Sequence, residues 1–524
     1  MTTSLGRLVR PGAREEHRGA ATPPRPATPP PATAPGPAAP RPARPADPGR
    51  PAGTGRRIAA DGAAAVVLIL VTPLCLLQAP NAIAWALNTV GGVAASPQAS
   101  TAVLRAAGLA LPAMAAMAGI AALAVLRLRA WPVLLAGLLI MAAGDALGGS
   151  ARTVAAIGVV RVLHGVAAGL ALPATVALAW DRGPRPRRWL AALWSVAAVA
   201  GLAAAPAVAR ARLTTGGWPA ALAPYPWLTG AGLTVAALYA VLAAVPGRRG
   251  PDGTRARRGR QDATQERAQL AVLAVPGVGL AALSVAVTYR PPAALLATGA
   301  VAVLILYGVG AVASADRLVG GPLCFPFLAA VTGLVVAPAA GAVTSLRALS
   351  PAASGEQSWL PLGLTVAATV AGVAAALALR RRPKVVVLAG LLIAVEGLAA
   401  ARLAGPYVPV LVLAGVSAPL AGGLAAALTA ALADAGMASA LSGVSLLLAG
   451  LMTGYLASGA VQVRMVTQLA PGGAVQAAAE RAGERLALAA ALGVWELAGL
   501  FSVLIAIGVT FLTGWARRTR APAR

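Results

Sequence analysis

Long apolar stretches are the feature that most constrains how this chain can fold. Stretches of about 20 residues, the length of helix needed to cross a bilayer, recur from residue 62 to residue 514. Hydrophobic residues make up 58% of the sequence and charged residues only 11%, which excludes an ordinary soluble protein. The stretches are rich in Ala, Gly, Val and Leu, which suits close helix packing in lipid. We therefore expect an all-α polytopic membrane protein.

Breaks at Gly, Pro and charged residues divide the apolar sequence into fourteen predicted transmembrane spans. They lie near residues 62–88, 101–126, 131–149, 153–180, 188–209, 225–246, 268–289, 292–314, 322–346, 358–380, 384–404, 406–433, 437–461 and 486–514.

The net charge of +27 is concentrated in a few loops and in both tails. Basic loops beside apolar spans follow the positive-inside rule and meet anionic lipid head groups, so the charge indicates membrane lipids and not a nucleic-acid partner. Fourteen spans with both termini cytoplasmic put every strongly basic loop on one side. Thirteen spans would put a basic cluster outside.

The predicted organisation is two six-helix halves joined by a pair of helices, as in many secondary transporters. The N-terminal segment, residues 1–57, lacks the apolar core of a signal peptide, and we expect it to be a solvated tail. The alternative is that it is a docking site for a proline-binding partner. The predicted parts are a disordered Pro/Ala/Arg-rich cytoplasmic tail (1–57), an N-terminal six-helix bundle (58–246), a basic cytoplasmic loop (247–267), two linking helices (268–314), a C-terminal six-helix bundle (315–516) and a basic cytoplasmic tail (517–524).

Cysteines and histidines are too few for a metal centre. Cys75 and Cys324 fall at or near apolar spans and read as small buried hydrophobes, and His17 and His164 are the only histidines. The glycines after Pro276 follow no strand and do not form a phosphate loop. The sequence therefore predicts no enzyme, no metal and no cofactor.

Ionisable residues inside the spans are the candidate site residues, because such groups are costly in lipid and usually face a bundle interior or a water-filled path. Arg105 and Asp145 lie close to the outer ends of their spans, where they would form a structural ion pair or an outer gate. Glu396 and Glu496 lie mid-span, where each would exchange protons or stay as a neutral hydrogen-bonded acid.

Arg161 and His164 lie three residues apart in the span 153–180 and are expected to share one helix face. One interpretation makes Arg161 a charge in the cavity and His164 a group that titrates near neutral pH. In the alternative, backbone carbonyls hold the pair in a purely structural role.

Prolines inside the spans are expected to break their helices, either as gates that expose backbone to a cavity or as kinks tolerated by packing. The residues concerned are Pro173, Pro206, Pro338 and Pro419, with Gly422 and Gly423 after the last.

Three short motifs follow one another in the order of a known family. They are Arg161-Val-Leu-His-Gly165 with Leu172-Pro173-Ala174, Gly217-Trp218 with Pro224-Tyr-Pro226, and Ala435-Gly-Met-Ala-Ser-Ala-Leu-Ser-Gly443 with Gly450 and Gly454. Through these motifs the chain resembles the major facilitator superfamily, specifically its fourteen-helix drug:proton antiporter branch. The resemblance implies that Arg161 lies in the cavity and takes part in proton coupling, and that the spans carrying Glu396 and Glu496 are peripheral.

Three other motifs of that branch are altered. Gln78 stands near the place of the family's first-span Asp and cannot carry a proton. The loop after the second span keeps Arg127 and Arg129 but lacks the family's Asp. The antiporter motif of the fifth span survives only as Gly201-Leu-Ala-Ala-Ala-Pro206.

The function expected from these features is a monomeric secondary exporter in the plasma membrane. It would move small amphipathic compounds, such as drugs, outward by alternating access in exchange for protons, with the proton gradient as energy source. Two alternatives remain: a transporter-fold membrane partner or scaffold that does not pump, and an uptake permease.

Overall fold

The computed structural model describes residues 52–80, 97–223, 225–244, 275, 277–286, 292–316, 323–348, 359–404, 410–469 and 493–512. Within these ranges the chain forms helices joined by short turns, and no strand occurs in them. The chain divides into two units, Met1–Pro51 and Ala52–Arg524, and all described residues belong to the second. The tail 1–51, the predicted loop 247–267 and the predicted tail 517–524 lie outside the described residues.

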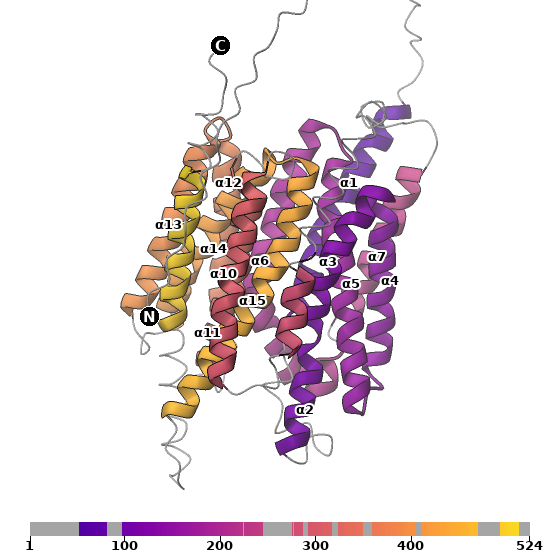
Figure 1. Ribbon diagram of the computed structural model, residues 1–524. Coiled ribbons are helices and arrows are strands. Elements are labelled where there is room, and N and C mark those ends of the chain that lie inside the picture. The colour runs from indigo at the N-terminus through magenta and orange to yellow at the C-terminus, as the bar shows by residue number, and fades with distance from the viewer. Residues whose placement is uncertain are drawn as a thin grey trace, which may run out of the picture. The chain divides into compact units, whose positions relative to one another are not determined.

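The helices follow one another in the order that the sequence predicts (Figure 1). The N-terminal half contains α1 (Ala52–Leu77), α2 (Pro97–Gly108), α3 (Ala110–Arg127), α4 (Ala130–Gly148), α5 (Val154–Trp180), α6 (Pro184–Ala220) and α7 (Pro226–Ala244). The linking part contains the short helix Gly277–Ala286 and α10 (Pro292–Ala315). The C-terminal half contains α11 (Phe325–Ala348), α12 (Leu360–Ala378), α13 (Pro383–Ala404), α14 (Val410–Ala433), α15 (Met437–Leu469) and a last helix, Gly493–Leu512.

Twelve of these helices are long and apolar enough to cross a membrane. Each overlaps one predicted span, and the two remaining predictions, 268–289 and 406–433, fall on the short helix Gly277–Ala286 and on α14, of which Ser417–Ala433 is a shorter apolar stretch. The described residues thus confirm a polytopic helical architecture. The predicted count of fourteen crossings and the cytoplasmic location of both termini stay predictions.

The bounds predicted for the first span were wrong at both ends. Helix α1 begins at Ala52, inside the segment predicted to be a disordered tail, and ends at Leu77 instead of reaching residue 88. The early end has a local cause: Pro80 disfavours a helical conformation for Ala79, so the chain leaves the helix before them.

The second predicted span is a kinked pair of helices. Helices α2 and α3 meet at Leu109, three residues before Pro112. Because proline has no backbone N–H, the carbonyl of Gly108 lacks the donor that would continue the ladder. The kink therefore exposes carbonyl oxygens within the apolar span Ala102–Arg127.

The other intramembrane prolines lie inside continuous helices, so the predicted breaks are not seen there, while the predicted alternative of a kink tolerated by packing stays a prediction. Pro173, Pro206, Pro338 and Pro419 lie inside α5, α6, α11 and α14, and each helix continues through its proline. A transmembrane helix tolerates the loss of one ladder hydrogen bond when neighbouring helices support it on both sides.

Glycines set how closely helices of one half approach. A Cβ atom on Gly450 would fall on the backbone carbonyl of Ala330, and one on Gly333 would fall on that of Leu447. Helices α11 and α15 therefore touch through their backbones. The Gly443–Gly450–Gly454 run of the third motif thus serves close packing of helices, as small residues do in lipid.

The two halves meet through α6 and α15. Helix α6 packs against α11, α12 and α14, while α15 packs against α3 and α5 (Figure 1). The linking helix α10 lies against α11 and α15.

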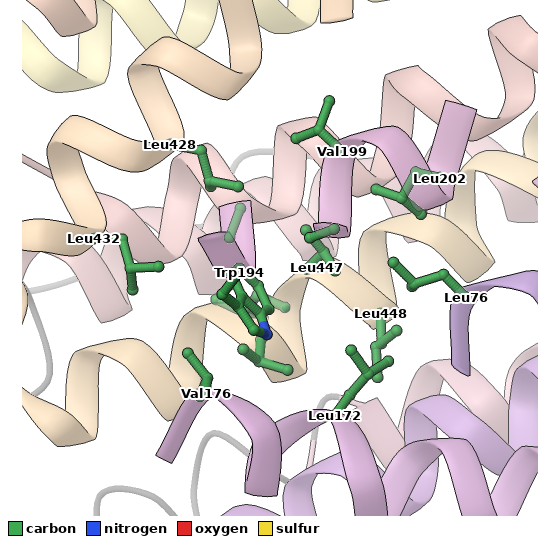
Figure 2. Close-up of a cluster of buried hydrophobic side chains, with 14 of the residues drawn as sticks. Leu76, Leu172, Val176, Trp194, Val199, Leu202, Leu428, Leu432, Leu447 and Leu448 are labelled. Atoms are coloured by element: carbon green, nitrogen blue, oxygen red, sulfur yellow. The ribbon is translucent and has the colours of Figure 1, made fainter. Parts of the chain in front are cut away.

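An apolar cluster fills part of this interface. Figure 2 shows Trp194 of α6 among Leu428 and Leu432 of α14 and Leu447 of α15, with residues of α1 and α5 nearby. Trp194 is fully buried, and its indole N–H donates to the hydroxyl of Thr175 at 3.2 Å. The cluster lies toward the end of the unit where α6 and α15 begin and α14 ends. We call this end of the unit the basic end, because its described loops and helix ends carry Arg127, Arg129, Arg182, Arg185, Arg187, Arg188, Arg380, Arg381, Arg382 and Lys384.

Candidate functional site

Arg161 is buried on α5 with its charge turned to backbone oxygens. Its side chain is 4% exposed. Nε donates to the carbonyl of Ala107 at 2.9 Å, and Nη2 donates to the carbonyls of Gln78 at 2.8 Å and Pro80 at 3.2 Å.

These three acceptors lie where α1 and α2 end. The last carbonyls of a helix have no intrahelical donor and carry the negative end of the helix dipole, so a buried cation is stabilised there. Arg161 therefore fastens α1 and the α2–α3 kink to α5. These contacts are those of the predicted alternative, in which backbone carbonyls hold the arginine.

His164, Asp145 and Thr229 form a buried polar triad that joins α5, α4 and α7. The Nε2 atom of His164 lies 3.1 Å from Oδ1 of Asp145, and the Thr229 hydroxyl donates to Oδ2 of Asp145 at 2.6 Å. His164 is fully buried and Asp145 is 8% exposed. Gly144 makes room for the imidazole, because a Cβ atom there would lie 2.8 Å from the ring.

This geometry differs from two expectations. Asp145 contacts His164 and Thr229 in place of the predicted partner Arg105. Arg161 and His164 lie on one helix but contact different neighbours, since Arg161 binds the ends of α1 and α2 and His164 binds α4. A separation of three residues rotates a side chain by about 60° around the helix, which is enough to change the partner in a packed bundle.

Gln78 lies just past the end of α1 with a buried side chain. The residue is 1% exposed, and neither polar atom of its carboxamide has a hydrogen-bond partner within the described part of the chain. The Nδ1 atom of His164 is also buried and has no hydrogen-bond partner among the described residues. Buried polar atoms of this kind are unusual, so both residues stay candidates for contact with a ligand or a water molecule.

The two mid-span glutamates lie in different environments. Glu396 is exposed on the outer face of α13, contrary to the expected burial, because that helix packs on α14 through its opposite face around Gly390. Glu496 is 7% exposed on the last helix, and the guanidinium of Arg402 lies beside Gly493, one turn before it. The structure brings neither glutamate to the triad.

A cavity of about 840 Å³ lies at the end of the unit opposite the basic end. Its walls come from the α2–α3 kink, the first turns of α5, the linking helix Gly277–Ala286 and α15, so both halves contribute. The wall is apolar except for Arg105, Ser284 and Tyr455. Among the described residues, no group of three or more His, Cys, Asp or Glu side chains is placed to hold a metal.

Sequence reasoning missed Thr229, Tyr455 and Pro112 as candidate site residues. Thr229 gives no signal in the sequence, because threonines are common in transmembrane helices and only packing brings it to Asp145. Tyr455 directly follows Gly454 of the third motif, and Pro112 is a proline inside a predicted span, so both offered a signal.

Comparisons with known proteins show the fold. No protein-family model and no curated protein sequence matches the chain. The chain is similar in structure to a bacterial homologue of the human drug peptide transporters PepT1 and PepT2, at 14% identity and a TM-score of 0.53, covering 88% of this chain and 99% of that one. It is also similar to the major facilitator superfamily proton:xylose symporter XylE, at 14% identity and a TM-score of 0.51, covering 85% of this chain and 95% of that one. The chain therefore has the fold of the major facilitator superfamily.

Proposed function

We propose that this chain, with its major facilitator fold, is a secondary active transporter that exports small amphipathic compounds by alternating access in exchange for protons. The observation that carries the proposal is an asymmetry between the two ends of the unit. A cavity lies between the halves at one end, while the Trp194 cluster packs the halves together toward the other. A transporter that works by alternating access needs one end closed while the other admits substrate.

The proposed proton site is the pair formed by Asp145 and His164. Because Gln78 cannot titrate, the proton carrier that the antiporter branch has in its first span must come from elsewhere. The pair places a carboxyl and an imidazole, two groups that can carry a proton, within 3.1 Å of each other at a buried position. Thr229 orients the carboxylate through its 2.6 Å hydrogen bond.

Arg161 has a positioning role in this proposal. It ties the ends of α1 and α2 to α5, one helical turn from His164. In this proposal a change in the charge of the Asp145–His164 pair is transmitted along α5 to the carbonyls that Arg161 holds, one of which, that of Ala107, belongs to α2 at the cavity wall.

The remaining features of the proposal follow from the sequence. The chain would act as a monomer in the plasma membrane, surrounded by lipids, with the proton gradient as its energy source and no catalytic chemistry. The buried Asp145–His164 pair supports a transporter over a scaffold, because ionisable groups inside the membrane are costly to retain without a function.

The test is transport in proteoliposomes under an imposed pH gradient, with a panel of lipophilic compounds. We expect gradient-driven accumulation by the unmodified chain and uncoupled or absent transport by Asp145→Asn and by His164→Gln, with Glu396→Gln as the control. Accumulation in the direction of the proton flow would identify an uptake permease. Neither solute nor proton flux with any compound would overturn the transport proposal in favour of a scaffold.

A further inference from the structure

The 840 Å³ cavity has the size of a small-molecule site, for which about 300–1,000 Å³ is usual. It lies within the first three turns of α5, from Val154 to Leu163, so it extends about 15 Å from the end of that helix. At this depth it would face one leaflet of the bilayer. Val159 and Val162 on its rim are 56% and 36% exposed, so the cavity opens sideways from the helical unit.

Helix α5 packs loosely against the opposite wall of the cavity at Gly158. A Cβ atom on Gly158 would meet only Leu109 and Ala106, at ordinary contact distances of 3.6 and 3.7 Å. Two turns further along α5, a Cβ atom on Gly165 would collide with the carbonyl of Ala110. Helix α5 thus touches α3 closely beyond the cavity but leaves space at Gly158, where a larger side chain would be tolerated.

The polar residues on the wall, Arg105, Ser284 and Tyr455, can all donate hydrogen bonds. Arg105 supplies a positive charge, and the described wall residues include no carboxylate. The hydroxyl of Tyr455 is buried and has no hydrogen-bond partner among the described residues. Both groups can donate hydrogen bonds to an anion, and the remainder of the wall matches a hydrocarbon chain.

We infer that this cavity binds an amphipathic anion that passes sideways between the cavity and the bilayer, with its anionic head at Arg105 and Tyr455 and its apolar body along α5 and α15. The inference rests on the proposed function in so far as the bound anion is the substrate to be exported. The linking helix Gly277–Ala286 forms part of the wall through Ser284, so the two-helix insertion would contribute directly to substrate binding.

The experiment is photolabelling of the full chain in zwitterionic vesicles, without any ion gradient, by a long-chain carboxylate that carries a photoreactive group in its apolar chain. The probe is compared with the matching uncharged alcohol. An ion pair with hydrogen bonds that is partly shielded from water favours the carboxylate by roughly tenfold. We expect labelled peptides from α5 and α15.

Three variants and a control locate the site. Arg105→Gln should remove the roughly tenfold preference for the carboxylate, and Tyr455→Phe should reduce it severalfold. Gly158→Leu should reduce labelling by both probes, because its side chain takes up space between α5 and the wall residues Leu109 and Ala106. Arg152→Gln, which removes an exposed arginine from a loop at the same end, should change neither.

A second arm separates the two sources of an amphipathic anion. Competition by anionic phospholipid in the vesicles would identify a lipid head group as the occupant, and labelling that resists this lipid would identify a free amphiphile; both results support an anion site. Equal labelling by the alcohol, or labelling unchanged in Arg105→Gln and Gly158→Leu, would overturn it. Since no gradient is applied, labelling without transport would count against the proposed function alone.

Discussion

Arg161 illustrates how one side chain can stabilise several helix ends in lipid. Its guanidinium uses two nitrogens, Nε toward the carbonyl of Ala107 and Nη2 toward the carbonyls of Gln78 and Pro80. A lysine has one nitrogen and cannot reach both sets of carbonyls. We therefore expect Arg161→Lys to lose about 2 kcal/mol of stability, the value of one hydrogen bond to a charged group. Thermal unfolding in detergent measures the loss.

The matching control is Arg152→Lys, at an exposed position just before α5. Its unfolding temperature should equal that of the unmodified chain. If Arg161→Lys also unfolds at the unmodified temperature, Arg161 does not hold the ends of α1 and α2 in the manner described.

A substitution at Gly144 tests the proposed proton site while Asp145 and His164 themselves stay unchanged. In Gly144→Ala the new methyl would lie 2.8 Å from the His164 ring, so the imidazole must move away from Asp145. We expect transport that is less than one tenth of normal and no longer depends on the pH gradient, because even about 1 Å of displacement costs that much at a functional site. Gly149→Ala, one residue beyond α4 with nothing within 4 Å, should transport normally. Coupled transport by Gly144→Ala would contradict the assignment of the proton site.

Partners at the residue scale could not be predicted from the sequence. The sequence singled out Arg161, His164 and Asp145, since charge in an apolar span is visible in any chain. Their contacts join residues 19 to 84 positions apart, and these depend on helix rotation, which an almost uniformly apolar helix does not reveal. Helices α4 and α7 are apolar on their exposed faces as well as on their buried faces, so hydrophobicity alone does not orient Asp145 or Thr229.

At the scale of elements, helix contacts in this fold depend on glycines whose removal should separate helices. In Gly450→Ala the added Cβ would fall on the carbonyl of Ala330, so α15 must move away from α11. We expect a loss of about 1–3 kcal/mol, the usual cost of overpacking. Gly459→Ala on the same helix has nothing within 4 Å and should be neutral or slightly stabilising. Equal unfolding temperatures for the two variants would contradict this role for Gly450.

The elements themselves were largely predictable. The length of an apolar run between charges fixes where a helix enters and leaves the bilayer, so spans such as 153–180 and 437–461 overlap α5 and α15 closely. Kinks were not predictable in the same way. Pro112 and Pro173 look alike in sequence, yet only the first lies at a break between helices, because the response of a helix to proline depends on its neighbours.

At the scale of the whole molecule, the arrangement of the two halves is a conformational state that chemical labelling can test. In a background of Cys75→Ala and Cys324→Ala, Gly158→Cys places a thiol in the cavity and Leu428→Cys places one in the Trp194 cluster. Without a gradient, a membrane-impermeant maleimide applied to intact cells should label position 158 and leave position 428 unlabelled from either side, because the apolar cluster excludes water.

The same pair of thiols separates a transporter from a scaffold with this fold. If the halves exchange between two arrangements, a pH gradient with substrate present should lower labelling at position 158 and expose position 428 to reagent applied from the basic end. A scaffold would show the resting pattern under every condition. Labelling of position 158 from the cytoplasmic side alone would instead reverse the predicted topology, since the cavity and the basic loops lie at opposite ends of the unit.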